Sequence, residues 1–203
     1  MTTATETDEP DRRERISGRN ELVVAGIYEA YHDAIPETVK QLNLPQRPEN
    51  VLLFGPTGTG KTWAAVALMR AWSKEFDRFG RRECRYHEWD LRFIKSAEIL
   101  MLLRESYGPR ATSTESEVIR KFQGIGLLVI DDLGAERVSD WSLSSLYLIL
   151  DHRMQRRKPT ILSTNMDLKQ LDQMDSRIAS RLGGMHLVKL KGQDLRLKAG
   201  RMP

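Results

Sequence analysis

The chain has 203 residues, with 32 Lys and Arg against 28 Asp and Glu, a formal charge of +4, 40% hydrophobic residues and one cysteine, Cys84. A chain of this size buries roughly 70% of its unfolded surface, which predicts one soluble domain that needs no disulfides, and the lone cysteine indicates a reducing compartment. Membrane and secretory classes are excluded, because no stretch approaches the roughly 18 apolar residues of a membrane span and residues 1–15 are acidic and polar. A cytoplasmic location without membrane contact is expected.

Three regions are expected along the chain. Residues 1–18 are charged and almost free of apolar side chains, which predicts a disordered acidic tail. Residues 19–47 are expected to form an N-terminal helical segment and a linker, with a helix that starts near residue 20 and ends before Pro36. Residues 48–203 form the core region.

Short apolar strands alternate with longer helical patterns in the core region. Strands are expected at 51–54, 91–95, 127–131, 160–164 and 186–190, and helices at 61–78, 96–107, 140–157 and 175–182. Strands that are buried on both faces form continuous apolar runs separated by helices. The alternation therefore predicts a central five-stranded parallel sheet in a three-layer α/β/α domain.

The segment between the first strand and the first helix matches G-x-x-x-x-G-K-[ST] at every specified position. Its residues are Gly55, Pro56, Thr57, Gly58, Thr59, Gly60, Lys61 and Thr62. The glycines let backbone N–H groups surround phosphate oxygens, Lys61 can reach the β- and γ-phosphates, and the Thr62 hydroxyl can ligate Mg²⁺. The pattern predicts a phosphate-binding loop, and the simpler alternative is a glycine-rich turn.

Polar side chains also close two later strands. Asp131 and Asp132 end the third strand, and open α/β sheets bind ligands at the carboxyl ends of their strands. Asp131 is expected to hold the Mg²⁺ shell, while Asp132 polarises an attacking water. Asn165 ends the next strand, and its amide could orient that water. Turn capping is the alternative for all three residues.

Two arginines, Arg177 and Arg181, lie four residues apart in the segment DSRIASRLGG, on one face of a predicted helix. A cation on a rigid helix can reach a phosphate bound by a neighbouring subunit and stabilise the charge of the transition state. Arg181 is the stronger candidate for this role. A solvated arginine face is the alternative.

In this order, the motifs resemble those of the AAA+ ATPases, and within them the DnaC-type replicative helicase loaders and the IstB-type transposition ATPases. The likeness covers roughly residues 48–198 and rests on GPTGTGKT, SAEILMLLRESY, LLVIDDLGAE, RRKPTILSTN and SRIASRL. It implies a P-loop NTPase of AAA+ type for residues 48–203. Because about a dozen residues follow the last strand, no C-terminal helical lid domain is expected.

The resemblance also implies roles and partners. The motifs correspond to Walker A at Lys61 and Thr62, Walker B at Asp131 and Asp132, sensor 1 at Asn165 and the arginine finger at Arg181. It implies an Mg²⁺-dependent ATPase whose ATP sites are shared in a homo-oligomer, and which binds single-stranded DNA to load or remodel a replicative helicase. The alternatives are an IstB-like ATPase that binds duplex DNA and regulates a transposase, and a non-catalytic, ATP-gated adaptor.

Positive charge gathers in clusters at 78–85, 153–158 and 189–201, which would suit contacts to a DNA backbone or would simply be solvated faces. Around the loop GPRATSTES, basic residues and Tyr107 could add phosphate contacts and base stacking. Those basic residues are Arg104, Arg110 and Lys121. The alternative for Tyr107 is a core position at the end of a helix. Core or interface positions are predicted for Trp63, Trp72, Trp89 and Trp141.

Overall fold

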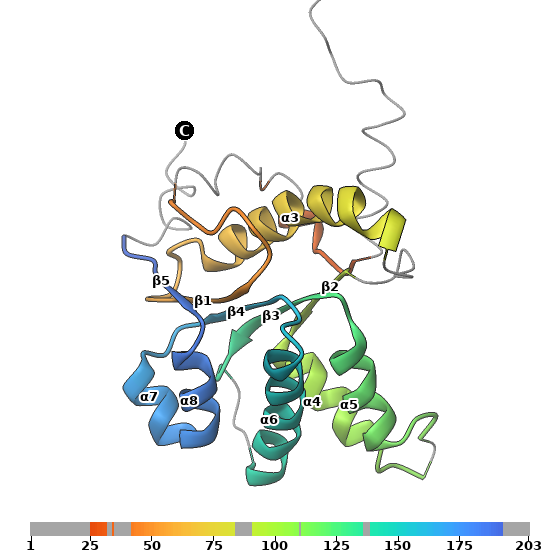
Figure 1. The fold of residues 1–203 in the computed structure, drawn as a ribbon. Helices are drawn as coiled ribbons and strands as arrows, with labels where there is room; N and C mark the ends of the chain where they lie inside the picture. The colour runs from red at the N-terminus through yellow and green to blue at the C-terminus, as the bar shows by residue number, and fades with distance from the viewer. Residues whose placement is uncertain are drawn as a thin grey trace, which may run out of the picture.

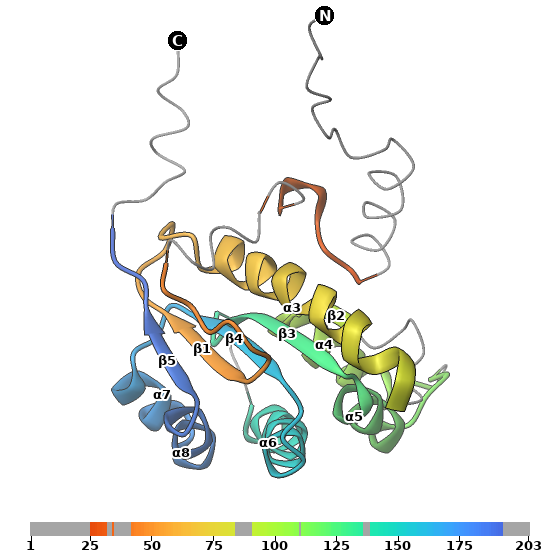
Figure 2. The same cartoon turned by 45° about the horizontal axis from the view of Figure 1, so that its top comes forward.

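A computed structural model describes residues 25–31, 34, 42–83, 91–109, 111–135 and 139–192, with the backbone alone for 73–83. The predicted tail at 1–18 and the last residues, 193–203, lie outside this part of the chain. The strands are β1 (Asn50–Phe54), β2 (Leu91–Lys95), β3 (Leu127–Leu133), β4 (Thr160–Thr164) and β5 (His186–Lys189). They form one sheet in the order β2-β3-β4-β1-β5, and every neighbouring pair is parallel, which confirms the predicted sheet (Figure 2).

Helices cover both faces of the sheet. They are η1 (Glu29–Tyr31), α3 (Lys61–Glu83), α4 (Ser96–Glu105), α5 (Glu115–Gly124), α6 (Asp140–Gln155), α7 (Leu168–Met174) and α8 (Ser176–Gly183). Figure 1 shows α3 on one face and α4 to α8 on the other, which gives the predicted three layers. Among the described helices, none is long and apolar enough to cross a bilayer.

Alternate residues of β1, β3 and β4 enter different cores, which explains the apolar runs in these strands. Leu52 pairs with Leu162 in register, and both contribute to the core beneath α4, α5, α6 and α8. Val51 pairs with Ile161, and both contribute to the core under α3. All four side chains are fully buried. The carboxyl ends of β1, β3 and β4 therefore meet at one edge of a rigid sheet.

Two helices, α5 and α7, were absent from the sequence prediction. Each begins with a reciprocal cap: Thr114 with Glu117, and Asp167 with Gln170. Both helices are short, at 10 and 7 residues, and bury few side chains, so the apolar periodicity that identifies longer helices is weak in them. The spacing of cap and third residue was the available signal.

The helix predicted from residue 20 to 35 is not present over residues 25–31. A turn with φ +83° at Gly26 precedes the short 3₁₀ helix η1. The N–H of Phe93 donates to the carbonyl of Ala25 at 2.7 Å, so this segment follows the outer edge of β2. A Cβ at Gly26 would lie 2.7 Å from the Phe93 carbonyl oxygen, which requires glycine there. Of the rest of the predicted helix, only Ala34 is described, and it is not helical.

Arg153 is fully buried, contrary to its expected place in a basic surface cluster. Its guanidinium donates to the Thr160 hydroxyl at 2.9 Å and to the carbonyls of Phe122 at 2.9 Å and Pro159 at 2.8 Å. The carbonyls of Ile125 and Gly126 also accept. Burial lowers the pKa of Arg153 to about 9. This side chain joins the end of α5, α6 and the start of β4 inside the protein, where DNA has no access.

Replacing Arg153 with Met should lower the free energy of unfolding by about 3 kcal/mol, because the buried carbonyls lose their donors. Arg156→Met is the matched control, since Arg156 is exposed at the end of the same helix, and it should change stability by about 0.5 kcal/mol or less. Urea unfolding followed by circular dichroism measures both. Equal, small effects would contradict the structural role of Arg153.

Candidate functional site

A cavity of about 260 Å³ lies at the carboxyl ends of the strands, beside the first turn of α3. Residues of the loop 55–62 form one wall, and Asp132 and Asn165 face it from the ends of β3 and β4. Tyr31 and Trp63 also line the cavity. Motifs that are more than 100 residues apart in the sequence therefore meet around one space.

The loop 55–62 adopts a conformation that depends on glycine. Gly55 has φ +145°, and a Cβ there would lie 2.1 Å from the carbonyl oxygen of Leu190, so a larger residue would displace the chain after β5. The Lys61 amine crosses the loop and donates to the carbonyls of Gly55 at 2.9 Å and Pro56 at 2.7 Å. The loop is thus closed over the amino end of α3, where helix N–H groups favour an anion.

Asp131 is buried beneath the cavity, with 1% of its surface exposed. The Thr62 hydroxyl lies 3.1 Å from both of its carboxylate oxygens, and the Ser163 hydroxyl donates to Oδ1. Burial raises the pKa of Asp131 above its usual value, and the hydrogen bonds from Ser163 and Thr62 act in the opposite direction. A hydroxyl and a carboxylate in contact are hard oxygen donors of the kind that Mg²⁺ takes from proteins.

Protein ligands beyond this pair are few. In the described ranges, no three His, Cys, Asp or Glu side chains come together to hold a metal. Mg²⁺ sites commonly use one or two protein oxygens and complete their shell with phosphate oxygens and water. Thr62 and Asp131 fit that pattern, since they adjoin the loop in which a phosphate would lie.

A β-bulge turns Asp132 toward the cavity. Ile130 pairs with Leu162, but the next pair is Leu133 with Thr164, so β3 contains one extra residue at this point. Asp132 has φ +57°, a conformation that non-glycine residues adopt rarely. Leu133 then returns to the core, where it is 2% exposed.

Hydrogen bonds hold the Asp132 backbone on both sides. Its N–H donates to the Ser163 hydroxyl at 3.0 Å, and its carbonyl accepts from the Ser96 hydroxyl at 2.9 Å. Both serines are buried. Neither was identified from the sequence, because the strands in or beside which they lie, β4 and β2, already contain other polar residues and no spacing rule marks these serines.

Two aromatic residues that line the cavity were also missed. Tyr31 ends η1, and its ring meets the Trp63 ring edge to face at 6.4 Å. Trp63, which was predicted to be a core or interface residue, is half-buried: it packs against the core under α3 and also lines the cavity. Trp72 is buried as predicted, Trp141 is half-buried, and Trp89 lies outside the described residues.

The two arginines of α8 do not line the cavity of their own chain. The Arg181 guanidinium donates to Asp151 of α6 at 2.6 Å, and its side chain is 40% exposed. Arg177 pairs with Asp175 at 2.7 Å. Both guanidinium groups lie over the ring of Tyr147, at 5.2 Å for Arg177 and 5.9 Å for Arg181. Arg181 therefore lies at the surface, paired with Asp151 and outside the cavity of its own chain.

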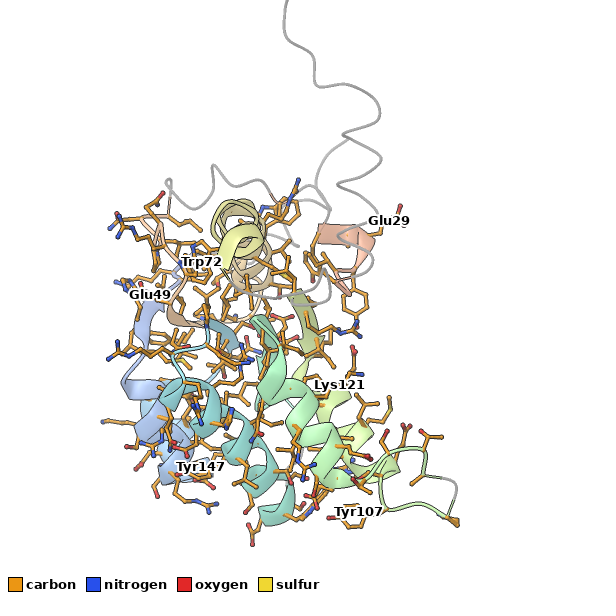
Figure 3. The ribbon with its side chains drawn as sticks, turned by 45° about the vertical axis from the view of Figure 1, so that its right-hand side comes forward. Glu29, Glu49, Trp72, Tyr107, Lys121 and Tyr147 are labelled. Atoms are coloured by element: carbon orange, nitrogen blue, oxygen red, sulfur yellow. The ribbon has the colours of Figure 1, made fainter. Side chains whose placement is uncertain are left out.

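Tyr107 is 62% exposed, so the alternative of a core position was wrong. Its ring meets Trp141 edge to face at 5.2 Å, and its hydroxyl bonds with Glu115. Figure 3 shows it at the end of the molecule that points away from the sheet. Arg104 and Lys121 are exposed on α4 and α5, while Arg110 lies outside the described residues. The structure describes no side chains for the predicted basic cluster at 78–85, and few for the one at 189–201.

Comparisons with known proteins place this architecture among ATP-binding proteins. A family model described as IstB-like ATP binding protein matches residues 32–202. An ATP-binding protein of insertion sequence IS232 from Bacillus thuringiensis subsp. berliner is 26% identical over 164 residues, which cover 77% of this chain and 59% of that protein. The replicative helicase loader DnaC of Escherichia coli (strain K12) is 23% identical over 132 residues, which cover 64% of this chain and 49% of that protein.

A crystal structure of the DnaC helicase loader superposes with a TM-score of 0.60 and 21% identity, over 81% of this chain and all of that chain. This likeness shows the fold, and it agrees with the α/β fold with a five-stranded parallel sheet that the sequence predicts. The chain spans between about half and three fifths of the length of the two curated relatives above. Since the family model matches most of the sequence, this chain belongs to the family of IstB-like ATP-binding proteins.

Proposed function

We propose that this protein binds ATP with Mg²⁺ in the cavity and hydrolyses it, in the cytoplasm, to act on a DNA-bound partner protein. One observation carries the proposal. The phosphate loop with Lys61 and Thr62 faces Asp132 and Asn165 across a single cavity. These residues supply an anion site, a metal ligand and two polar groups for water, which together are what phosphoryl transfer to water requires.

Phosphate oxygens would be held by the loop backbone and by Lys61. The Lys61 amine now donates to two carbonyls of its own loop. A bound triphosphate offers charged acceptors in their place, and hydrogen bonds between charged groups are stronger than those to a neutral carbonyl. The amino end of α3 adds positive potential at the same position.

Thr62 and Asp131 would hold Mg²⁺, which when bound neutralises phosphate charge. Asp132 is then free to act on water, because its carboxylate lies beyond the buried pair and lines the cavity. Asn165 is exposed at the end of β4 and lines the same cavity, so its amide can donate to or accept from that water. The bulge in β3 separates the two acidic roles.

Transition-state charge would be stabilised by Arg181 of a neighbouring subunit. Arg181 is part-exposed and lies outside its own cavity. A site that is completed in this way is active only in an oligomer, which makes ATP turnover a signal of assembly.

The partner proposal has two forms. A transposase is favoured by the match to the IstB-like family and by the relative from an insertion sequence. A replicative helicase, as inferred from the sequence motifs, is favoured by the similarity to DnaC in sequence and fold. The two forms differ in the DNA on which the protein would assemble.

The first test separates an enzyme from an ATP-gated adaptor. Asp132→Asn should keep ATP affinity within about twofold and lower turnover by about 100-fold or more, because a neutral amide cannot accept the proton of the attacking water. Lys61→Ala should weaken ATP binding about 10- to 100-fold, through loss of a charged hydrogen bond. Equilibrium binding of labelled ATP and steady-state phosphate release measure these effects. Unchanged binding and turnover in Lys61→Ala would contradict the proposed site.

The second test addresses the shared site. Wild-type turnover per subunit should rise with protein concentration, and Arg181→Ala should lower the plateau by about 100-fold or more while ATP affinity is kept. Arg177→Ala is the matched control, since Arg177 lies one turn away over the same tyrosine ring, and it should keep most of the turnover. Equal losses in both variants would point to damage to α8 instead of a shared site.

The third test compares DNA forms. ATP turnover of the wild-type protein should be stimulated several-fold by DNA, with single strands and duplexes compared at equal nucleotide concentration and at two salt concentrations. Preference for duplex supports the transposase form, and preference for single strands supports the helicase form. Equal turnover with and without either DNA would argue against a DNA-bound partner.

A further inference from the structure

One buried hydroxyl contacts both acidic residues of the site. Ser163 lies on β4 with no exposed surface, and its Oγ donates to Oδ1 of Asp131. The same Oγ accepts the N–H of Asp132 at 3.0 Å. Because the accepted N–H occupies one side of the oxygen, the hydroxyl proton is directed at the carboxylate.

Packing does not account for a serine at this position. Its register partner on β1 is Leu53, and β4 is otherwise fully buried between two apolar cores. A hydroxyl in such a place is unfavourable unless it is hydrogen-bonded, and an aliphatic side chain would meet no such cost. The hydrogen bonds to the two acidic residues are therefore the reason for a hydroxyl here.

Asp131 needs a donor that takes no part in metal binding. Thr62 contacts both carboxylate oxygens, but it is the other proposed ligand of Mg²⁺. Ser163 reaches Oδ1 from the neighbouring strand and leaves Oδ2 available. It can therefore fix the rotation of the carboxylate whether or not the metal is bound.

Asp132 needs support because its backbone is in the left-handed region, at φ +57°. A non-glycine residue stays in this conformation only when its surroundings hold it there. The Ser163 oxygen holds the N–H, and Ser96 holds the carbonyl. Loss of the first contact would let the bulge relax and would move the Asp132 carboxylate relative to the phosphate loop.

We infer that Ser163 is a positioning residue that sets Asp131 for Mg²⁺ and Asp132 for the attacking water. The inference rests on the proposed function and adds to it a residue that touches neither ATP nor water. Ser163 couples the two acidic residues, because its Oγ is hydrogen-bonded to both of them.

The experiment compares Ser163→Ala with Ser145→Ala in the full chain. Ser145 is also buried, and its hydroxyl donates to the Glu115 carboxylate at 2.8 Å, so this control removes a similar hydrogen bond away from the cavity. The first measurement is the Mg²⁺ gain, which is the ATP dissociation constant in EDTA divided by the ATP dissociation constant with Mg²⁺. The second is amide hydrogen exchange of Asp132 without nucleotide, and the third is steady-state turnover.

Ser163→Ala should reduce the Mg²⁺ gain in ATP affinity about tenfold, with binding in EDTA unchanged. Its Asp132 amide should exchange at least about tenfold faster than in the wild type, and the maximal rate should fall more than the Michaelis constant changes. Ser145→Ala should match the wild type in all three measurements. The inference is overturned if Ser163→Ala keeps the wild-type Mg²⁺ gain, or if both variants change alike.

Two further measurements decide the remaining cases. If Ser163→Ala does not fold, Ser163→Cys replaces it, because the thiol keeps a weak donor. This variant should show an intermediate Mg²⁺ gain. A Mg²⁺ gain equal to that of the wild type would overturn the inference. Rapid exchange of the Asp132 amide in the wild-type protein would also overturn it, without any variant. If the wild type binds ATP but does not hydrolyse it, the proposed function fails, while the Mg²⁺ gain and the amide exchange still decide the role of Ser163.

Discussion

The burial of the Asp131 carboxylate is the constraint on which the site depends. A carboxylate without exposed surface must be hydrogen-bonded, and here Thr62 from α3 and Ser163 from β4 supply the donors. One side chain thereby joins the phosphate loop to the middle of the sheet. Burial raises the pKa of Asp131 in the folded protein. Without a bound cation, ionisation of this carboxyl therefore destabilises the folded state as the pH rises above the pKa that Asp131 has in the unfolded chain. A cation at this position would remove that penalty.

The β-bulge solves a geometric problem that two successive acidic residues create. In a regular strand, neighbouring side chains point to opposite faces, so Asp132 would enter the apolar core beneath α6. The extra residue in β3 turns Asp132 into the cavity and restores Leu133 to that core. The strained backbone at Asp132 is the cost of bringing both carboxylates to one edge of the sheet, and two buried serines hold it.

Sequence patterns predicted most of the fold because the strands and the long helices carry strong periodic signals. The patterns failed where a helix is short or where tertiary contacts override the local preference. The capping boxes of α5 and α7 begin helices that bury few residues. The segment at 25–31 has helical periodicity, yet pairing with the edge of β2 and the conformation of Gly26 take precedence. Arg153 illustrates the same limit, since a cation among basic residues is buried by neutral acceptors from α5, β4 and the residue before β4.

The sequence by itself predicted a phosphate-binding loop at 55–62 and oxygen ligands at the acidic end of β3, because fixed spacing and residue type are the signals for such sites. Only the tertiary structure decided which other groups share the cavity. Tyr31 and Trp63 line the cavity, and Ser163 lies buried beneath it, in contact with Asp131. These residues are separated along the chain and match no spacing rule, and they come together because parallel strands end at one edge and an N-terminal segment follows that sheet. Contacts of this kind depend on packing between distant elements, which no local pattern encodes.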